Sequence, residues 1–174
     1  MSTIEDPRWY AEGQMGLLER RRDLYAAGGL SARSALDAFT KRFDNLRQAQ
    51  AWAATMAEGD VDACKLCSDF PIVGADLLIL RQHPSETEKW LKAALKAAAA
   101  LGDKTKMALL YQHLGNVYEA LSQSQQALGQ FEKALALARE ENEEKIQDEA
   151  LGGSATHPLP SGRSKRLWSI IASN

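Results

Sequence analysis

Aliphatic residues that branch at the β-carbon are scarce in this chain, and their scarcity limits the fold more than any other feature of the sequence. They occur only at Val61, Val73, Val117, Ile4, Ile72, Ile79, Ile146, Ile170 and Ile171. Ala and Leu supply most of the other apolar positions. Both favour helices, whereas strands are enriched in Val, Ile and aromatic residues. We therefore predict an all-α fold.

The charges are nearly balanced, with 21 Lys and Arg against 23 Asp and Glu among 174 residues. Nucleic-acid binding needs a concentrated positive field, so we expect no direct nucleic-acid partner. The most apolar stretch, residues 93–102, is interrupted by Lys96 and is too short to span a bilayer. Residues 1–15 are polar and acidic, unlike a secretory signal. These features predict a cytoplasmic protein without a membrane span.

Start and stop signals predict about six or seven helices. Asp6 followed by Pro7 is a capping acid before a first-turn proline, and Gly28 with Gly29 is the matching stop. Pro71 predicts a kink or break, because proline removes a backbone donor and clashes with the preceding turn. The predicted helical segments are 7–27, 32–57, 60–83, 85–101, 104–121 and 123–141.

The helical pattern also suggests how the chain is organised. We predict an N-terminal helical region over residues 1–58, repeat-like helices over 59–141, and a frayed helix end with a disordered tail over 142–174. Pro158 and Pro160 make further helix unfavourable in the tail. The alternative for the tail is a short basic amphipathic anchor at residues 163–171.

Two segments of the sequence match each other at a spacing of 41 residues. Gly74 precedes Gly115 by that distance. The same spacing separates Phe70 from Tyr111, Leu77 from Tyr118, Trp90 from Phe131, and Ala93 from Ala134. Such a period indicates stacked helical hairpins, in which small residues lie where helices touch and aromatic residues fill the space between neighbours. In the second segment these residues would be Gly115, Ala127, Ala134, Tyr118 and Phe131.

Residues 108–141 resemble a tetratricopeptide repeat. The family pattern falls on Tyr111, Leu114, Gly115, Tyr118, Ala127, Phe131 and Ala134, and Arg139 stands where the family has a terminal proline. Residues 67–100 are similar to the same repeat more weakly. The resemblance implies a right-handed superhelical stack of antiparallel helix hairpins, with a concave groove for a protein or peptide partner. The partner-binding residues that it implies are Leu78, Ile79, Gln112, Asn116 and Glu119.

Residues 43–95 resemble the helical region of bacterial signal-transducing STAND regulators of the NB-ARC type. In those proteins an Asp-Asn-Leu-Arg segment and a Glu-x-x-x-Trp-Leu segment lead into tetratricopeptide repeats, and here they are residues 44–47 and 86–91. The phosphate-binding loop of the ATPase, G-x-x-x-x-G-K-[ST], does not occur in the sequence. The resemblance implies the sensor or scaffold part of such a regulator without its ATPase.

The sequence offers little for catalysis or metal binding. Cys64 and Cys67 form a C-x-x-C, but no second ligand pair lies at a usual zinc spacing, so we interpret them as packed thiols in a helix. The histidines His83, His113 and His157 are scattered. We therefore predict no metal, no cofactor and no enzymatic activity.

These observations together predict a non-enzymatic protein-protein interaction module. The first alternative is a self-associating scaffold, a homodimer joined through the exposed apolar ends of a short helical array. The second alternative is a small enzyme in which Cys64 or a histidine is the working group.

Overall fold

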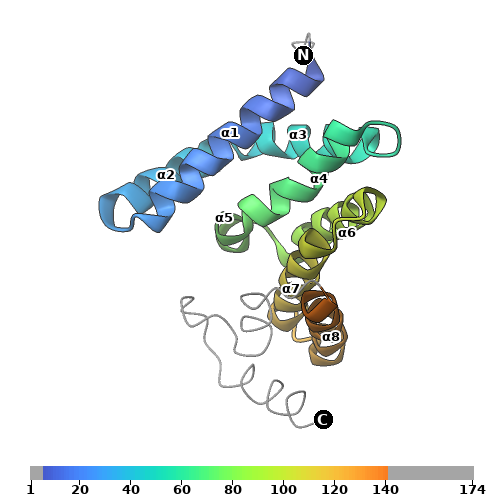
Figure 1. Ribbon diagram of the computed structural model, residues 1–174. Coiled ribbons are helices and arrows are strands. Elements are labelled where there is room, and N and C mark those ends of the chain that lie inside the picture. The colour runs from blue at the N-terminus through green and yellow to red at the C-terminus, as the bar shows by residue number, and fades with distance from the viewer. Residues whose placement is uncertain (1–5, 141–174) are drawn as a thin grey trace. The chain divides into compact units, whose positions relative to one another are not determined.

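The computed structural model describes residues 6–140, and the chain divides into two compact units, Met1–Gly102 (unit 1) and Asp103–Asn174 (unit 2). The described residues form eight α-helices and no strand (Figure 1). Unit 1 contains α1 (Pro7–Ala26), α2 (Gly29–Lys41), α3 (Phe43–Met56), α4 (Val61–Val73), α5 (Ala75–Arg81) and α6 (Pro84–Leu101). Unit 2 contains α7 (Lys104–Ala120) and α8 (Ser124–Glu140). The all-α prediction is confirmed, whereas the prediction of six or seven helices is wrong.

Helix α1 begins and ends where the sequence predicts. The side chain of Asp6 accepts hydrogen bonds from the backbone N–H groups of Arg8, at 3.0 Å, and Trp9, at 3.1 Å. These bonds satisfy donors that have no partner within the helix. After the helix, Gly28 and Gly29 have φ values of 74° and 59°, in the left-handed region that glycine adopts most readily.

The predicted helix over residues 32–57 is instead two helices, α2 and α3, because the chain turns at Arg42, where φ is -119° and ψ is 18°. Both helices pack against α1. A single helix of that length would extend about 39 Å, whereas the 20 residues of α1 span about 30 Å. The turn lets both halves reach α1, so tertiary packing decides the break.

The predicted helix over residues 60–83 is also two helices, and the break lies at Gly74 rather than at Pro71. A Cβ atom at Gly74 would lie 3.2 Å from Leu18 of α1 and 3.3 Å from Leu78 of α5. The chain therefore turns where its backbone comes close to α1. Pro71 lies within α4, near its C-terminal end.

The core of unit 1 lies between α1 and the helices packed on it. Helices α2, α3 and α4 all contact α1, and α6 packs against α4. The residues of this core that are nearly or fully buried include Ala11, Leu18, Phe39, Leu46, Ala49, Ala53, Cys67, Phe70, Leu77 and Leu78. Many are alanines, which allow the helix axes to approach closely and which leave little side chain to fill a gap.

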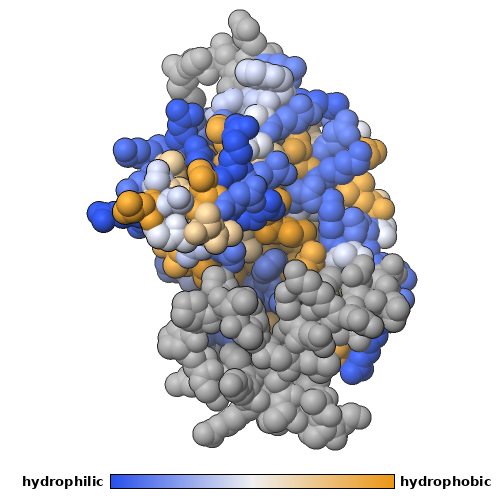
Figure 2. All heavy atoms as spheres, turned by 60° about the vertical axis from the view of Figure 1, so that its left-hand side comes forward, coloured by the Kyte–Doolittle hydropathy of each residue, from blue (hydrophilic) through white to orange (hydrophobic). Residues whose placement is uncertain are grey.

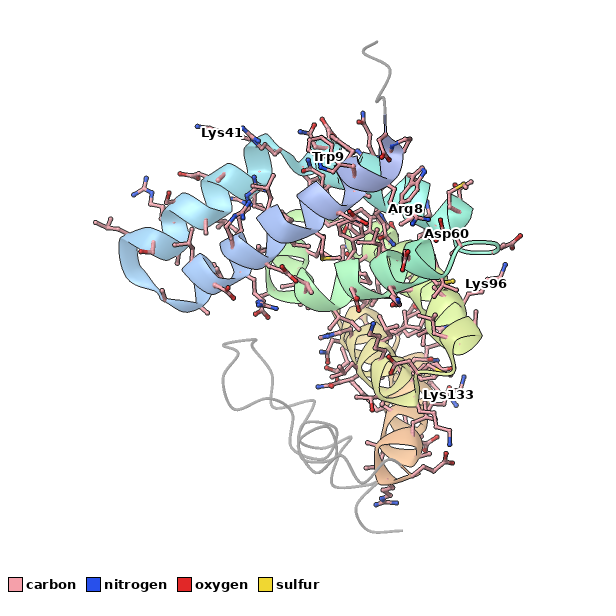
Figure 3. All side chains as sticks on the ribbon, turned by 45° about the horizontal axis from the view of Figure 1, so that its top comes forward. Arg8, Trp9, Lys41, Asp60, Lys96 and Lys133 are labelled. Carbon is pink, nitrogen blue, oxygen red and sulfur yellow. The ribbon has the colours of Figure 1, made fainter. Side chains whose placement is uncertain are left out.

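An ion pair joins the start of α1 to the start of α4. Arg8 pairs with Asp60, and its other nitrogen lies 3.0 Å from Asp62 (Figure 3). Asp60 also caps α4, because its carboxylate accepts the backbone N–H groups of Asp62, at 2.9 Å, and Ala63, at 3.1 Å. The hydrogen bond from Ala63 is the largest of the effects that hold the pKa of Asp60 below its ordinary value, and Arg8 adds to it.

Unit 2 contains a helical hairpin built on one very close contact. A Cβ atom at Gly115 of α7 would lie 2.4 Å from the ring of Phe131 in α8. Ala127 and Ala134 are fully buried on α8. The prediction that a small residue lies where the helices touch is confirmed for Gly115.

The turn of this hairpin is a Schellman motif. The backbone N–H of Gln123 donates to the carbonyl of Tyr118, and the N–H of Ser122 donates to that of Glu119, both at 2.8 Å. Ser122 has a φ of 60°, where glycine is more usual. These bonds satisfy the last carbonyls of α7 and reverse the chain.

Gly74 and Gly115 have different surroundings, although the sequence places them in register. The side chains nearest to Gly74 are Leu18 and Leu78, whereas Gly115 faces the aromatic ring of Phe131. Trp90, which matches Phe131 at the 41-residue spacing, stacks on Phe43. The residues that match at the 41-residue spacing therefore do not make the same contacts in the structure.

Exposed apolar side chains are distributed over several helices of unit 1. Those with the largest exposure among the described residues are Trp9, Leu24, Leu30, Met56, Val61 and Leu80. The face drawn in Figure 2 is mainly hydrophilic, with hydrophobic side chains interspersed.

We expect Gly115→Ala to destabilise the protein, although alanine favours helices by about 1 kcal/mol over glycine. The added methyl group overlaps the buried ring of Phe131, and such overpacking costs about 1–3 kcal/mol. Thermal unfolding followed by helical circular dichroism measures the change. Gly129→Ala is the matched control, because open space surrounds that glycine and the substitution should raise the unfolding midpoint. A Gly115→Ala protein as stable as the Gly129→Ala protein would contradict the close contact.

The lowered pKa of Asp60 predicts an acid-sensitive contribution to stability. The contribution is complete above the unfolded-state pKa, about 3.9, and is lost as the pH falls through the lower folded-state pKa. We expect Asp60→Asn to reduce the fall in unfolding midpoint between pH 5 and about pH 2. Asp37→Asn, at an exposed position of α2, is the control and should leave the pH profile unchanged. An unchanged profile for Asp60→Asn would refute this role.

Candidate functional site

A groove lies between α3 and α6 in unit 1, with a volume of about 660 Å³. Its lining residues are Asp44, Arg47, Gln48, Gln50, Ala51 and Ala54 from α3, with Glu86, Lys89, Trp90 and Ala93 from α6. The three alanines occupy little volume, so the two helices leave space between their side chains. The polar residues supply charges of both signs.

Ion pairs connect the two sides of the groove. Arg47 of α3 lies 3.8 Å from the carboxylate of Glu86 on α6, and 3.6 Å from Asp44. All three side chains are substantially exposed, so these contacts are weak and can exchange for contacts with a ligand. Lys89 forms no ion pair with any residue that the structure describes, and its ammonium group is available to an anionic group of a partner.

Trp90 supplies a fixed aromatic surface in the groove. Its ring stacks on Phe43, with centroids 6.2 Å apart and an interplanar angle of 19°. Phe43 in turn contacts Phe39, at 5.4 Å between centroids. Phe39 is fully buried, so the chain of rings holds Trp90 against the core. A preorganised aromatic side chain of this kind loses little conformational entropy when a partner binds.

Gln50 connects the groove to the core. Its side chain is 2% exposed, and its Nε2 donates to the carbonyl of Cys67 at 3.5 Å. That carbonyl has no helical donor, because the residue four positions later is Pro71, which has no backbone N–H. Gln50 thus compensates for the proline. Its Oε1 is buried without a hydrogen-bond partner among the described residues.

The two cysteines behave as packed thiols. Cys64 and Cys67 are free and buried in α4, which confirms the interpretation made from the sequence. The Cys64 thiol donates to the carbonyl of Ala57 at 2.7 Å. Burial, with a smaller effect from Cys64, raises the pKa of Cys67 to about 11. A thiol with so high a pKa is a poor nucleophile at neutral pH.

The five residues predicted to bind a partner lie in both units. Leu78 is fully buried in α5 and Ile79 is partly buried. Gln112, Asn116 and Glu119 lie on α7, at spacings of four and three residues. Gln112 is buried, whereas Asn116 and Glu119 are partly exposed. The structure thus puts them on two separate helices, and their role in partner binding stays a prediction.

Sequence reasoning missed the groove between α3 and α6. Its lining includes Asp44 and Arg47 of the Asp-Asn-Leu-Arg segment, and Trp90, which the 41-residue spacing also singled out. Their meeting depends on the turn at Arg42, which the helical periodicity did not reveal. The exposed charges at Arg47 and Lys89 are ordinary for helix surfaces, so the sequence held no signal that distinguished them.

The comparisons with protein-family models, curated proteins and solved structures find no match to this chain. Within the described residues, no three His, Cys, Asp or Glu side chains are grouped closely enough to hold a metal ion. Nor does any helix in the described part of the chain have the length and apolar content needed to cross a membrane.

We expect Gln50→Leu to destabilise the protein by about 1–3 kcal/mol, because it leaves the buried Cys67 carbonyl without a donor. The same substitution should cost less in a Pro71→Ala background, where residue 71 regains an N–H that can donate to that carbonyl. Urea unfolding of the two single variants and the double variant measures this coupling.

Gln48→Leu serves as the control for this cycle, because Gln48 is exposed on the same helix and should not couple to Pro71. Additive effects of Gln50→Leu and Pro71→Ala would show that Gln50 does not compensate for the proline.

Proposed function

We propose that this chain is a non-enzymatic protein-protein interaction module, related to tetratricopeptide-repeat proteins and to the scaffold part of bacterial STAND regulators. The groove between α3 and α6 is the observation that carries this proposal. It is open, it holds a fixed aromatic ring, and its charged side chains are joined only by weak surface ion pairs.

The composition of the groove favours a peptide or helix as its ligand. Ala51, Ala54 and Ala93 leave room beside Trp90, and Arg47, Glu86 and Lys89 bring charges to the same space. An apolar centre with a polar margin is the usual anatomy of a protein interface. An amphipathic segment would place its apolar side chains against the alanines and an acidic side chain near Lys89.

The hairpin of unit 2 supports the family relation. Small residues at Gly115, Ala127 and Ala134 pack in the way that a tetratricopeptide hairpin requires. We propose that such hairpins stack in a right-handed superhelix and that the side of α7 bearing Asn116 and Glu119, which are partly exposed, forms a second partner-binding surface.

The test is affinity capture from the native host with quantitative mass spectrometry. We expect Ala51→Leu to reduce captured partner at least about tenfold, because the larger side chain fills the groove and forfeits well-packed contact area. Ala51 is exposed on α3, so the fold should tolerate the change. Ala99→Leu is the matched control, because Ala99 is exposed on α6 and does not line the groove.

The Asn116→Ala/Glu119→Ala double variant tests the second surface in the same experiment, because both side chains are partly exposed on α7. Loss of a partner only with Ala51→Leu assigns that partner to the groove, and loss only with the double variant assigns it to α7. Retention of every partner in all variants would refute the proposed function. Capture of an untagged copy of the chain would favour the homodimer instead.

A further inference from the structure

Helices α3 and α6 form the two sides of the groove without packing closely on each other. Both pack against α4, whereas they contact each other much less. Side chains on the facing sides of α3 and α6 therefore border open space instead of interdigitating. Two helices held apart in this way leave a position between them at which a further helix can pack.

Ion pairs between the two sides mark the length of the groove. Arg47 of α3 lies 3.8 Å from Glu86 of α6 at one end. Beyond the other end, Glu58, just after α3, lies 2.5 Å from Lys96 of α6, which Figure 3 labels. Because the two pairs follow the same order along both segments, α3 and α6 run in the same direction. The stretch of α6 from Glu86 to Lys96 extends about 15 Å, the length of nearly three helical turns.

The lining between these ion pairs offers little to the backbone of an extended peptide. Ala51, Ala54 and Ala93 have no polar side-chain atom, and the backbone groups of a helix interior already bond to each other. An extended segment lying on these residues would leave peptide groups without protein partners on that side. A helix satisfies its own backbone and presents only side chains. The groove therefore favours a helix over an extended segment.

The same lining indicates which side chains such a helix would carry. The alanines leave hollows that large aliphatic side chains can fill, and Trp90, stacked on Phe43, forms a fixed wall beside them. The other charged residues of the lining are joined to one another by ion pairs. Lys89 is exposed and forms no ion pair with any residue between positions 6 and 140. An acidic side chain on the ligand would complement its charge.

We propose that the groove between α3 and α6 binds an amphipathic helix of a partner protein, with large aliphatic side chains at positions i, i+3 or i+4, and i+7 against the alanines and an acidic side chain beside Lys89. This inference rests on the proposed function, because it names the ligand of the same groove. It is narrower, since it excludes an extended or proline-rich segment.

A phage-displayed library of random peptides, each of about 16 residues and so longer than the groove, tests the class of ligand. Selection uses the whole chain, and peptides that also bind the Ala51→Leu protein are removed, so that the remaining peptides depend on the groove. We expect these peptides to carry large apolar residues at helical spacing and an acidic residue at the margin of that apolar face. Circular dichroism should show that they gain helix on binding.

A proline at the centre of a selected peptide should weaken its binding at least about tenfold, because proline removes a hydrogen bond from a helix interior and clashes with the preceding turn. A central alanine in the same position is the matched control and should leave the affinity nearly unchanged. Isothermal titration with the unaltered chain measures both affinities.

Lys89→Glu should weaken binding of an acidic selected peptide several-fold, because it replaces an attraction by a repulsion, and changing the acidic residue of the peptide to Lys should restore the affinity. Lys41→Glu is the matched control, because Lys41 is exposed at the end of α2 and does not line the groove. It should change the affinity much less.

Three results would overturn this inference. The first is a set of groove-dependent peptides that lack helical spacing or tolerate a central proline, which would leave the proposed function intact. The second is equal binding of acidic peptides by the unaltered chain and Lys89→Glu. The third is the absence of any groove-dependent peptide. Selected peptides that match a segment of this chain would assign the groove to a second copy instead of a partner protein. The proposed function fails separately, when every partner captured from the native host is retained by all variants.

Discussion

The buried side of α1 limits the structure of unit 1, because α2, α3 and α4 all pack against it. A helix of 20 residues presents only a short surface, and longer helices cannot keep their full length in contact with it. The chain therefore turns at Arg42 and again at Gly74. Each turn exchanges a few helical hydrogen bonds for apolar contacts that a straight helix could not make. The turn at Arg42 also places α3 beside α6, so the groove depends on the same constraint.

Small residues decide how closely helices approach in both units. Gly115 allows the ring of Phe131 to lie against the backbone of α7, and Gly74 allows Leu18 to approach the start of α5. In the groove, Ala51, Ala54 and Ala93 have the opposite effect, since they face space that no neighbouring side chain fills. The same residue types thus produce tight contact where helices meet and a hollow where they diverge.

One polar side chain, that of Gln50, is buried in the core of unit 1 and forms a hydrogen bond there. Gln50 is in the core because Pro71 leaves the Cys67 carbonyl without a helical donor, and a polar group from another helix is needed to satisfy it. A buried polar group whose partner is found in the fold contributes to stability.

Local features of the sequence determined the helical class and the start of α1 at Asp6 and Pro7. They also determined the bounds of α6, α7 and α8 to within about one residue. Caps and periodicity suffice for this because they act over a few neighbouring positions. Local features also determined the contact at Gly115, where a small residue and an aromatic residue sit in facing helices of one hairpin. Tertiary structure alone decided the turns at Arg42 and Gly74 and the groove between α3 and α6. Each of these depends on helices distant in sequence coming together, and the free energy of that packing is not contained in any one segment.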